Sequence, residues 1–185
     1  VTSSNVHNVA IEGTFDDCQD LVKALFANDS FRTEHNLSAV NSINWARVMA
    51  QIVYYVVAAG RCRPDGSPVS FSVPTGNFGN VFAGWAAARM GVPVAQLVIG
   101  SNRNDVLPRW LATGRIRTGE VHATLSPSMD IAVSSNHERL LFELSGRDGA
   151  RVAELMAELR GEGEVTVPDE VMGPVRETWA AASFD

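Results

Sequence analysis

Lysine is almost absent from this sequence, because Lys23 is the only one among 185 residues. The other fourteen basic residues are arginines scattered along the chain, and the net charge is -6 with a pI near 5.2. Neutralising the phosphates of a nucleic acid requires clustered Lys and Arg side chains. The one local basic stretch, at Arg61 and Arg63, is expected to be a solvated loop. We therefore predict no nucleic-acid partner.

Cysteines and long apolar runs are also scarce. Cys18 and Cys62 have neither a zinc-site spacing nor a CxxC pair, which predicts free thiols and a cytoplasmic, reducing setting. No segment approaches the roughly 20 apolar residues that span a membrane, so no membrane association is expected. The N-terminus has no pattern of a secretion signal. It also lacks an initiator methionine, so we expect the natural chain to begin upstream.

The remaining composition, 45% hydrophobic and 19% charged, is that of a folded domain with one sizeable core. Short apolar runs bounded by Gly or Pro predict strands at 6–13, 69–73 and 92–100. Apolar spacing and caps predict helices beginning at 16–17, over 45–59, over 81–90 and from 104–105 to 114. The apolar helix over 45–59 is expected to lie packed between neighbours. This alternation predicts an α/β fold: a doubly wound parallel sheet with helices on both faces.

From residue 136 onward the pattern is mainly helical. Helices are expected over 138–144, 150–160 and 170–182, with one short strand in the 161–168 linker. We therefore divide the chain into a partial α/β domain over residues 1–132 and a mainly helical extension over 133–185. The pattern leaves open whether the residues from 136 onward form a separate lobe or pack on the sheet.

The most informative segment is Thr75-Gly-Asn-Phe-Gly-Asn80, which joins an expected strand to an expected helix. A helix start presents unpaired N–H groups and the positive end of the helix dipole, so it attracts phosphate. Glycines let the backbone approach the anion, and Thr75, Asn77 and Asn80 can donate side-chain hydrogen bonds. The loop lacks the lysine of a P-loop and the G-x-G-x-x-G spacing of a dinucleotide site. Taken alone, it is equally consistent with a plain connecting turn.

Several segments together resemble threonine synthase, a member of the fold type II pyridoxal-phosphate enzymes. The matching segments are Gly13-Thr-Phe-Asp-Asp-Cys-Gln19, Asn41-Ser-Ile-Asn-Trp-Ala-Arg47, Val73-Pro-Thr-Gly-Asn-Phe-Gly-Asn80 and Ser126-Pro-Ser-Met-Asp-Ile131. Further matches at 51–55, 102–105 and 134–141 extend the resemblance over roughly residues 5 to 160. The resemblance implies that the phosphate of pyridoxal 5'-phosphate is held by the loop residues Gly76, Asn77, Phe78, Gly79 and Asn80, to which the loop chemistry adds Thr75.

The resemblance also implies an activity, the conversion of O-phosphohomoserine and water to threonine and phosphate. A phosphorylated substrate needs a second anion site. The candidates are three neutral donors and a guanidinium near one helix start, namely Asn41, Ser42, Asn44 and Arg47. The alternative is that Asn41 and Ser42 only cap the helix while Arg47 faces solvent.

The sequence departs from the family pattern in its lysines. The family holds its cofactor as a Schiff base on a lysine that also moves protons. Lys23 lies outside the family's Lys-Asp context and is expected to be a solvated helix residue, so no catalytic residue is assigned here. The family's Ser-Gly-Asp-Thr-Gly loop and the segment near the pyridine nitrogen are missing too. We therefore expect a central fragment, inactive alone, whose partners are the missing N- and C-terminal segments and whose cut sheet leaves apolar surface exposed.

Two other interpretations stay open: a non-catalytic phosphate-ligand or partner-binding module, and a serine or threonine dehydratase-like enzyme. Asp16 and Asp17 are interpreted as helix caps rather than paired catalytic acids. The segment 126–130 is expected to be a structural turn. No metal site is expected, since no metal-ligand spacing occurs among the histidines, which are His7, His35, His122 and His137.

Overall fold

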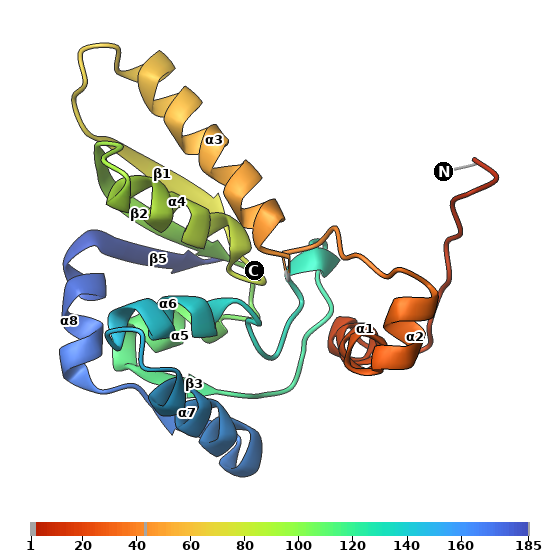
Figure 1. Cartoon of the computed structure of the whole chain (residues 1–185). Helices are drawn as coiled ribbons and strands as arrows, with labels where there is room; N and C mark the ends of the chain where they lie inside the picture. Colours follow the sequence, from red (N-terminus) through yellow and green to blue (C-terminus); the bar gives the residue numbers. More distant parts are fainter. Residues whose placement is uncertain (1–2, 43, 185) are drawn as a thin grey trace. The chain divides into compact units, whose positions relative to one another are not determined.

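The structure is a computed structural model that describes residues 3–42 and 44–184 (Figure 1). The chain divides into two compact units, Val1–Ser38 and Ala39–Asp185. The predicted division after residue 132 stays a prediction, because compact units within this chain do not define the domains of a longer one.

The first unit contains two helices, α1 (Phe15–Ala27) and α2 (Asp29–Glu34). A capping box begins α1: Asp17 N donates to Thr14 Oγ1, and Thr14 N donates to the Asp17 carboxylate at 2.7 Å. The prediction that Asp16 and Asp17 lie at a helix start is confirmed, but the N-cap residue is Thr14 and both aspartates lie in the first turn. The strand predicted over 6–13 is wrong, since these residues are exposed and pair with no strand. Val9 is 81% exposed, so this apolar run gains no burial that would favour pairing.

The second unit is built on three parallel strands in the order β1 (Val69–Pro74), β2 (Val94–Ser101) and β5 (Trp179–Ser183). The predictions of β1 and β2 are confirmed, and the fold is α/β. The helix predicted to run to residue 182 is wrong at its end, because α8 (Asp169–Thr178) stops where β5 begins. Helix propensity favoured the alanines of β5, but pairing with β2 and burial of Trp179 prevail.

The unit also contains a second, smaller sheet and further helices. Two short strands, β3 (Arg115–Arg117) and β4 (Glu164–Thr166), form an antiparallel pair, and β4 is the short strand expected in the 161–168 linker. The helices before α8 are α3 (Trp45–Cys62), α4 (Gly79–Arg89), α5 (Val106–Thr113), the short 3-10 helix η1 (Pro127–Met129), α6 (His137–Leu144) and α7 (Gly149–Glu162).

One continuous hydrophobic core joins these elements. It includes Val73 and Ile99 from the sheet, Trp110 from α5, Leu140 from α6 and Val175 from α8. The residues from 136 onward therefore pack on the sheet and complete it with β5, which settles the question that the sequence pattern left open.

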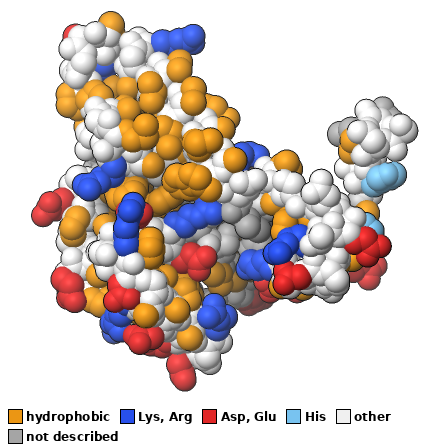
Figure 2. Space-filling view, viewed as in Figure 1, with side chains coloured by type: hydrophobic (Ala, Val, Ile, Leu, Met, Phe, Trp, Pro, Cys, Tyr) orange, Lys and Arg blue, Asp and Glu red, His pale blue; other side chains and the backbone are white. Residues whose placement is uncertain are grey.

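Helix α3 has an uncovered apolar face. Its buried residues, Val48, Ile52, Tyr55 and Ala59, form one side, which packs against α4. Its other side exposes large apolar residues, namely Trp45, Met49, Val53, Tyr54, Val56 and Val57. Figure 2 shows hydrophobic side chains gathered over this part of the molecule. Exposed apolar surface, which we expected of a fragment, is present on α3. The prediction that neighbours enclose this helix is wrong within this unit.

No helix among the described residues is long and apolar enough to cross a membrane.

Candidate functional site: the start of helix α4

The loop between β1 and α4 begins with a residue that closes the strand. Thr75 N donates to Gly100 O at 2.8 Å, which continues the pairing of β1 with β2. The Thr75 hydroxyl donates to Val73 O at 2.6 Å, and the residue is buried. The hydroxyl proton of Thr75 is therefore engaged within the protein, and this residue fixes the start of the loop to the end of β1.

The next two peptide groups of the loop turn their carbonyls toward the segment before α6. Gly76 O accepts from Ser134 Oγ at 2.8 Å. Asn77 O accepts from Asn136 Nδ2 at 2.8 Å and from Asn136 N at 3.3 Å. Because C=O and N–H point in opposite directions in a trans peptide, the N–H groups of Asn77 and Phe78 point away from that segment. The loop therefore has two sides. On its carbonyl side, the carbonyls of Gly76 and Asn77 accept hydrogen bonds from the protein, and on its amide side lie the N–H groups of Asn77 and Phe78.

Phe78 holds a left-handed backbone conformation at the start of α4, with φ of 66° and ψ of -9°. Such a conformation costs a residue with a Cβ roughly 1–3 kcal/mol. The phenyl ring is 1% exposed and stacks on Trp179 with ring centroids 5.6 Å apart. Burial of the ring offsets the backbone strain. Among the described residues no side chain caps this helix, so its first N–H groups, from Gly79 to Val81, remain open.

Two asparagine side chains flank these amides with their oxygens already occupied. Tyr55 Oη donates to Asn80 Oδ1 at 3.2 Å and to Asn80 O at 2.9 Å. Burial raises the pKa of Tyr55, so its hydroxyl stays protonated as a donor. Ser135 Oγ donates to Asn77 Oδ1 at 3.2 Å. The Nδ2 groups of Asn77 and Asn80 are left to serve an acceptor, which adds two neutral donors to the helix start.

The two glycines of the loop are required by packing against other segments. A Cβ on Gly79 would lie 2.6 Å from the Cβ of Ser42, and a Cβ on Gly76 would lie 3.0 Å from Ser128 O. They let the 42 and 128 segments press against the loop and hold its shape. That these glycines also let the backbone approach an anion stays a prediction.

Ser42, one of the four residues predicted for a second anion site, lies against the loop at Gly79. Asn44 caps α3, since Ala46 N donates to Asn44 Oδ1 at 3.0 Å, and its Nδ2 donates to Ala39 O at 2.7 Å. Arg47 is exposed and donates to Val40 O at 3.0 Å. Asn41 O accepts from Asn44 N at 3.1 Å. The cap that we assigned to Asn41 and Ser42 as the alternative belongs to Asn44.

Sequence reasoning missed the residues that support the loop from α6. Asn136 Nδ2 donates to Ser42 Oγ at 2.8 Å as well as to the loop, and Arg139 donates to Ser42 O at 2.9 Å. The available signals were the polar run 134–136 before a helix, which is equally typical of an ordinary cap, and the family match over 134–141, which assigned these residues no role. Only the fold reveals that these side chains reach residues that lie about sixty positions or more away in sequence.

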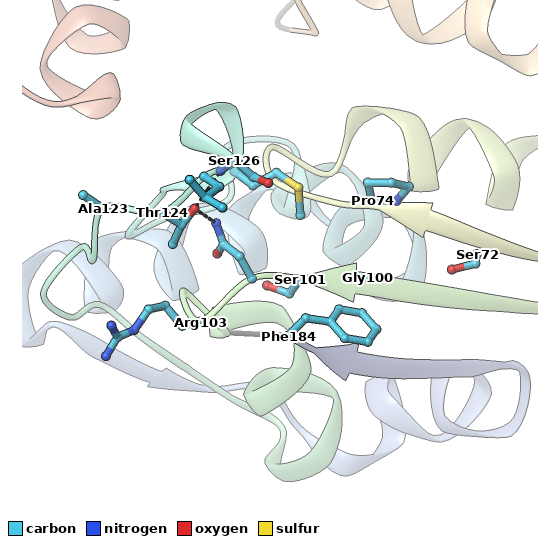
Figure 3. A pocket seen from close by; sticks show the side chains of 12 residues that line it. Ser72, Pro74, Gly100, Ser101, Arg103, Ala123, Thr124, Ser126 and Phe184 are labelled. Atoms are coloured by element: carbon cyan, nitrogen blue, oxygen red, sulfur yellow. Dashed lines mark hydrogen bonds between the residues drawn. The ribbon is translucent and has the colours of Figure 1, made fainter.

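A pocket of about 620 Å³ lies at the carboxyl ends of the parallel strands (Figure 3). Its lining includes Pro74 at the end of β1, Gly100 and Asn102 at the end of β2, and Thr124 and Ser126 from the segment that leads to η1. Ligands of open α/β sheets bind at this edge. The pocket therefore begins at the residue directly before the loop.

The ionisable groups nearest the loop do not supply an amine. Lys23 belongs to the first unit, where its Nζ lies 3.3 Å from Asp20 Oδ1 and its side chain is 52% exposed, which confirms it as a solvated helix residue. The second unit contains no lysine. Complete burial lowers the pKa of His137 to about 3, so this residue is a neutral part of the core beside Phe78. Among the described residues no group of three or more metal-ligating side chains is present.

Comparison with known proteins gives consistent relatives. No protein-family model matches the chain. The chain is 54% identical over 170 residues to threonine synthase of Pseudomonas aeruginosa, which covers 92% of this chain and 36% of that protein. It is 36% identical over 189 residues to human threonine synthase-like 2, with coverage of 99% and 39%.

Solved structures agree with these sequence relatives. The crystal structure of pyridoxal-phosphate-bound threonine synthase from Brucella melitensis matches with a TM-score of 0.86 at 50% identity, covering 97% of this chain and 39% of that one. Threonine synthase from yeast matches with a TM-score of 0.83 at 39% identity, covering 100% and 38%. The chain thus spans between a third and two fifths of the length of these relatives.

Proposed function

Because the chain belongs to the threonine synthase family, we propose that it is the cofactor-phosphate-binding segment of a pyridoxal-phosphate-dependent threonine synthase. The complete protein converts O-phosphohomoserine and water to threonine and phosphate. Its partner is therefore a small phosphorylated substrate. The remaining N- and C-terminal segments of the same protein supply the other parts of the active site.

The observation that supports this proposal best is the division of the loop into two sides. The carbonyls of Gly76 and Asn77 are held by the 134–136 segment, which turns the amides of Asn77 and Phe78 toward the open start of α4. These amides, the first N–H groups of α4 and the Nδ2 groups of Asn77 and Asn80 form an all-donor set that suits a phosphate. Thr75, Gly76, Phe78 and Gly79 hold the set in shape.

Pyridoxal 5'-phosphate, when bound, supplies an electron sink for a negative charge that develops on the substrate. The residues of this chain bind and orient it by its phosphate. The adjacent pocket at the strand ends takes the rest of the cofactor and the substrate. Because residues 39–185 contain no lysine, the amine that holds the cofactor and moves protons lies elsewhere in the complete protein.

For the phosphate of the substrate we propose the 41–47 segment, with Ser42 and Arg47 as the residues that test it. Ser42 packs against Gly79, and Arg47 carries the only cationic side chain of this segment. Arg47→Ala in the complete enzyme is expected to raise KM for O-phosphohomoserine. An unchanged kcat/KM removes Arg47 from the site.

Two further features belong to the complete protein. Ser70 and Ser72 of β1 are exposed on the face opposite the buried Val73, and this bare face supports a doubly wound sheet with helices on both faces once the other segments are present. The apolar side of α3 is covered in the same way. The two cysteines are free thiols, which supports a cytoplasmic setting.

The experiment that tests this function uses the complete protein containing these residues. Its intact mass is compared with the 19.9 kDa of the present chain, pyridoxal 5'-phosphate is added, and phosphate release from O-phosphohomoserine is measured. A larger mass, a visible absorbance band and phosphate release support the proposal. A mass of 19.9 kDa with no release would leave a non-catalytic phosphate-binding module. Ammonia release from serine or threonine without phosphate chemistry would indicate a dehydratase.

A further inference from the structure

A carboxylate with four hydrogen bonds lies beside the proposed cofactor site and has no role in it so far. Asp130 Oδ1 accepts from Asn102 Nδ2 at 2.6 Å, from Asn104 Nδ2 at 3.0 Å and from Thr124 Oγ1 at 2.7 Å. Its other oxygen, Oδ2, accepts from Thr124 N at 2.9 Å. We call this set, Asn102, Asn104, Thr124 and Asp130, the Asp130 clasp.

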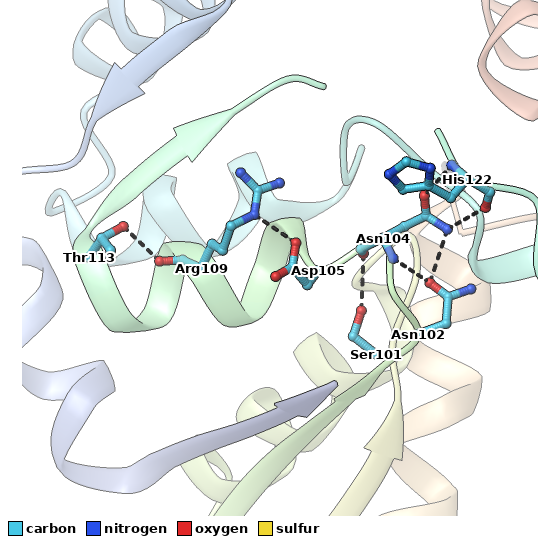
Figure 4. A network of polar contacts seen from close by, with 7 residues as sticks. All are labelled: Ser101, Asn102, Asn104, Asp105, Arg109, Thr113 and His122. Atoms are coloured by element: carbon cyan, nitrogen blue, oxygen red, sulfur yellow. Dashed lines mark hydrogen bonds and ion pairs between the residues drawn. The ribbon is translucent and has the colours of Figure 1, made fainter. Parts of the chain in front are cut away.

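The clasp joins the end of β2 to a segment far away in sequence. Asn102 Oδ1 accepts from the backbone and the side chain of Asn104, which fixes the turn after β2 (Figure 4). Asn104 also exchanges two hydrogen bonds with the backbone of His122, one to its carbonyl at 2.8 Å and one from its N–H at 2.7 Å. Asn102 and Asn104 are buried, so this network is rigid and costly to break.

The segment that the clasp secures is the one that touches the loop. Asp130 directly follows η1 (Pro127–Met129). A Cβ on Gly76 would lie 3.0 Å from Ser128 O and 3.3 Å from the Cα of Met129, so η1 rests directly on Gly76. Thr124 and Asn102 also line the pocket beside the loop (Figure 3). A chain of contacts therefore links the end of β2 to Asp130, Asp130 to η1, and η1 to Gly76. The carbonyl of Gly76 in turn accepts from Ser134.

We propose that Asp130 is a positioning residue, which seats η1 on Gly76 and so holds the amide side of the loop toward the cofactor phosphate. This inference rests on the proposed function for its ligand but not for its geometry. All four hydrogen bonds of Asp130 come from protein donors, so its oxygens are engaged within the clasp. Asp130 is therefore neither a general base nor a ligand of the cofactor.

The charge of Asp130 is part of its function. Partial burial alone raises the pKa of this carboxyl, but hydrogen bonds from Thr124, Asn102 and Asn104 outweigh that effect and lower the pKa below its ordinary value. The clasp is thus built around an ionised acceptor. An amide in its place has one acceptor oxygen and an NH2 group that faces other donors.

The test compares Asp130→Asn with Asp105→Asn in the complete protein containing these residues. Asp105 follows the same turn, but its carboxylate forms an exposed ion pair with Arg109 at 2.7 Å and does not reach the loop. Thr124→Val serves as a second variant if Asp130→Asn does not fold, because it keeps the carboxylate and removes the Thr124 hydroxyl, which donates to Asp130 and accepts from Asn102 Nδ2 and Ser126 N. Two quantities are measured at a temperature where circular dichroism shows folded protein: the nuclear Overhauser effect between the Hα atoms of Gly76 and Met129, and the affinities for pyridoxal 5'-phosphate and for pyridoxal.

Asp130→Asn is expected to abolish the Gly76–Met129 signal and to weaken pyridoxal 5'-phosphate binding about tenfold, with pyridoxal binding unchanged. Asp105→Asn is expected to change neither quantity. An unchanged signal together with unchanged affinity overturns the proposal, as does an equal loss for both ligands, which indicates general loosening. If the unsubstituted protein binds no pyridoxal 5'-phosphate, the proposed function fails, and the Gly76–Met129 signal still decides whether Asp130 seats η1.

Discussion

The two long helices that flank β1 begin in opposite ways. Helix α3 begins at a self-contained cap, in which Asn44 satisfies Ala46 N and the nearby Val40 carbonyl is held by Arg47. Helix α4 begins at Phe78 in a left-handed conformation, and no described side chain caps its first turn. Both starts were predicted as anion sites from their sequences. The comparison teaches that backbone amides at a helix start can bind an anion only where no cap satisfies them, so an anion at the start of α3 would depend on side chains such as Arg47.

The difference is maintained by buried groups beneath α4. The ring of Phe78 packs among Trp110, His137 and Trp179, and this packing holds a backbone conformation that a local sequence does not favour. At the start of α3, by contrast, Trp45 is 49% exposed and Asn44 does the capping with its own side chain. The uncapped start of α4 is therefore determined by tertiary packing, whereas the capped start of α3 is determined by residues close in sequence.

Removing the ring of Phe78 gives the largest expected change. Phe78→Ala is expected to destabilise the protein by about 3–5 kcal/mol, because it leaves a cavity under the loop. Phe184→Ala is the control, since its side chain is 66% exposed, and its effect should stay within about 0.5 kcal/mol. Urea denaturation measures both. Equal effects of the two substitutions would mean that the core does not support the α4 start.

Low pH is expected to destabilise the fold through His137, whose ring contacts that of Phe78. Burial lowers the pKa of His137 to about 3 in the folded state, while the ordinary value is 6.5. The unfolded chain therefore binds a proton below pH 6.5 that the folded chain does not, and stability falls as the pH drops from about 6.5 toward 3. The loss attributable to this group is on the order of 3 kcal/mol at about pH 4.5.

His137→Leu provides the control for the acid effect. Urea midpoints of the two proteins, measured at neutral pH and near pH 4.5, separate His137 from the carboxylates that titrate in both. The variant should show the weaker pH dependence. A pH dependence that is the same in both proteins would show that His137 does not titrate in this way.

Replacing one glycine of each helix with alanine is expected to change stability in opposite directions. Gly79→Ala in α4 is expected to cost about 1–3 kcal/mol, because the new Cβ overlaps Ser42, and to weaken pyridoxal 5'-phosphate binding. Gly60→Ala in α3 meets no atom within 4 Å and should stabilise the helix by about 0.4–1 kcal/mol. Thermal melting and ligand titration measure the pair. Opposite signs are the prediction, and two neutral substitutions would contradict it.

The smallest expected change concerns the cap of α3. Asn44→Ala is expected to destabilise the protein by about 1 kcal/mol through the lost cap, with no change in pyridoxal 5'-phosphate affinity. Asp148→Ala, which removes the corresponding cap of α7, is the matched control and should cost a similar amount. A selective loss of cofactor affinity in Asn44→Ala would place this helix start in the cofactor site.

Local patterns predicted what local forces determine. The strands β1 and β2, the helix α5 that ends at Gly114 and the cap at Asp148 all follow from apolar spacing and side-chain chemistry near in sequence. The same patterns failed where distant residues decide. The sequence of β5 favours a helix, but pairing with β2 makes it a strand. The apolar run over 6–13 favours a strand, but no strand pairs with it.

Some residues of the candidate site could likewise be predicted from the sequence, and others could not. Residues 75–80 could be selected from the sequence, because strand, glycine loop and helix follow one another directly. Asn136, Ser134 and Asp130 could not, since their roles depend on contacts with Asn77, Gly76 and the end of β2 that no sequence spacing announces. The packing of Ser42 against Gly79 could not be predicted for the same reason, because Ser42 precedes Gly79 by 37 positions.

The contrast between the two helix starts is tested most directly by following backbone amides during a titration with pyridoxal 5'-phosphate, with pyridoxal as the ligand that lacks the phosphate. The complete protein containing these residues is used, and amide resonances are compared for residues 77–81 and 45–47. We predict phosphate-dependent shifts at 77–81, with none of comparable size at 45–47. Shifts that are absent from 77–81, or that occur equally with pyridoxal, would contradict the assignment of the α4 start as the phosphate site.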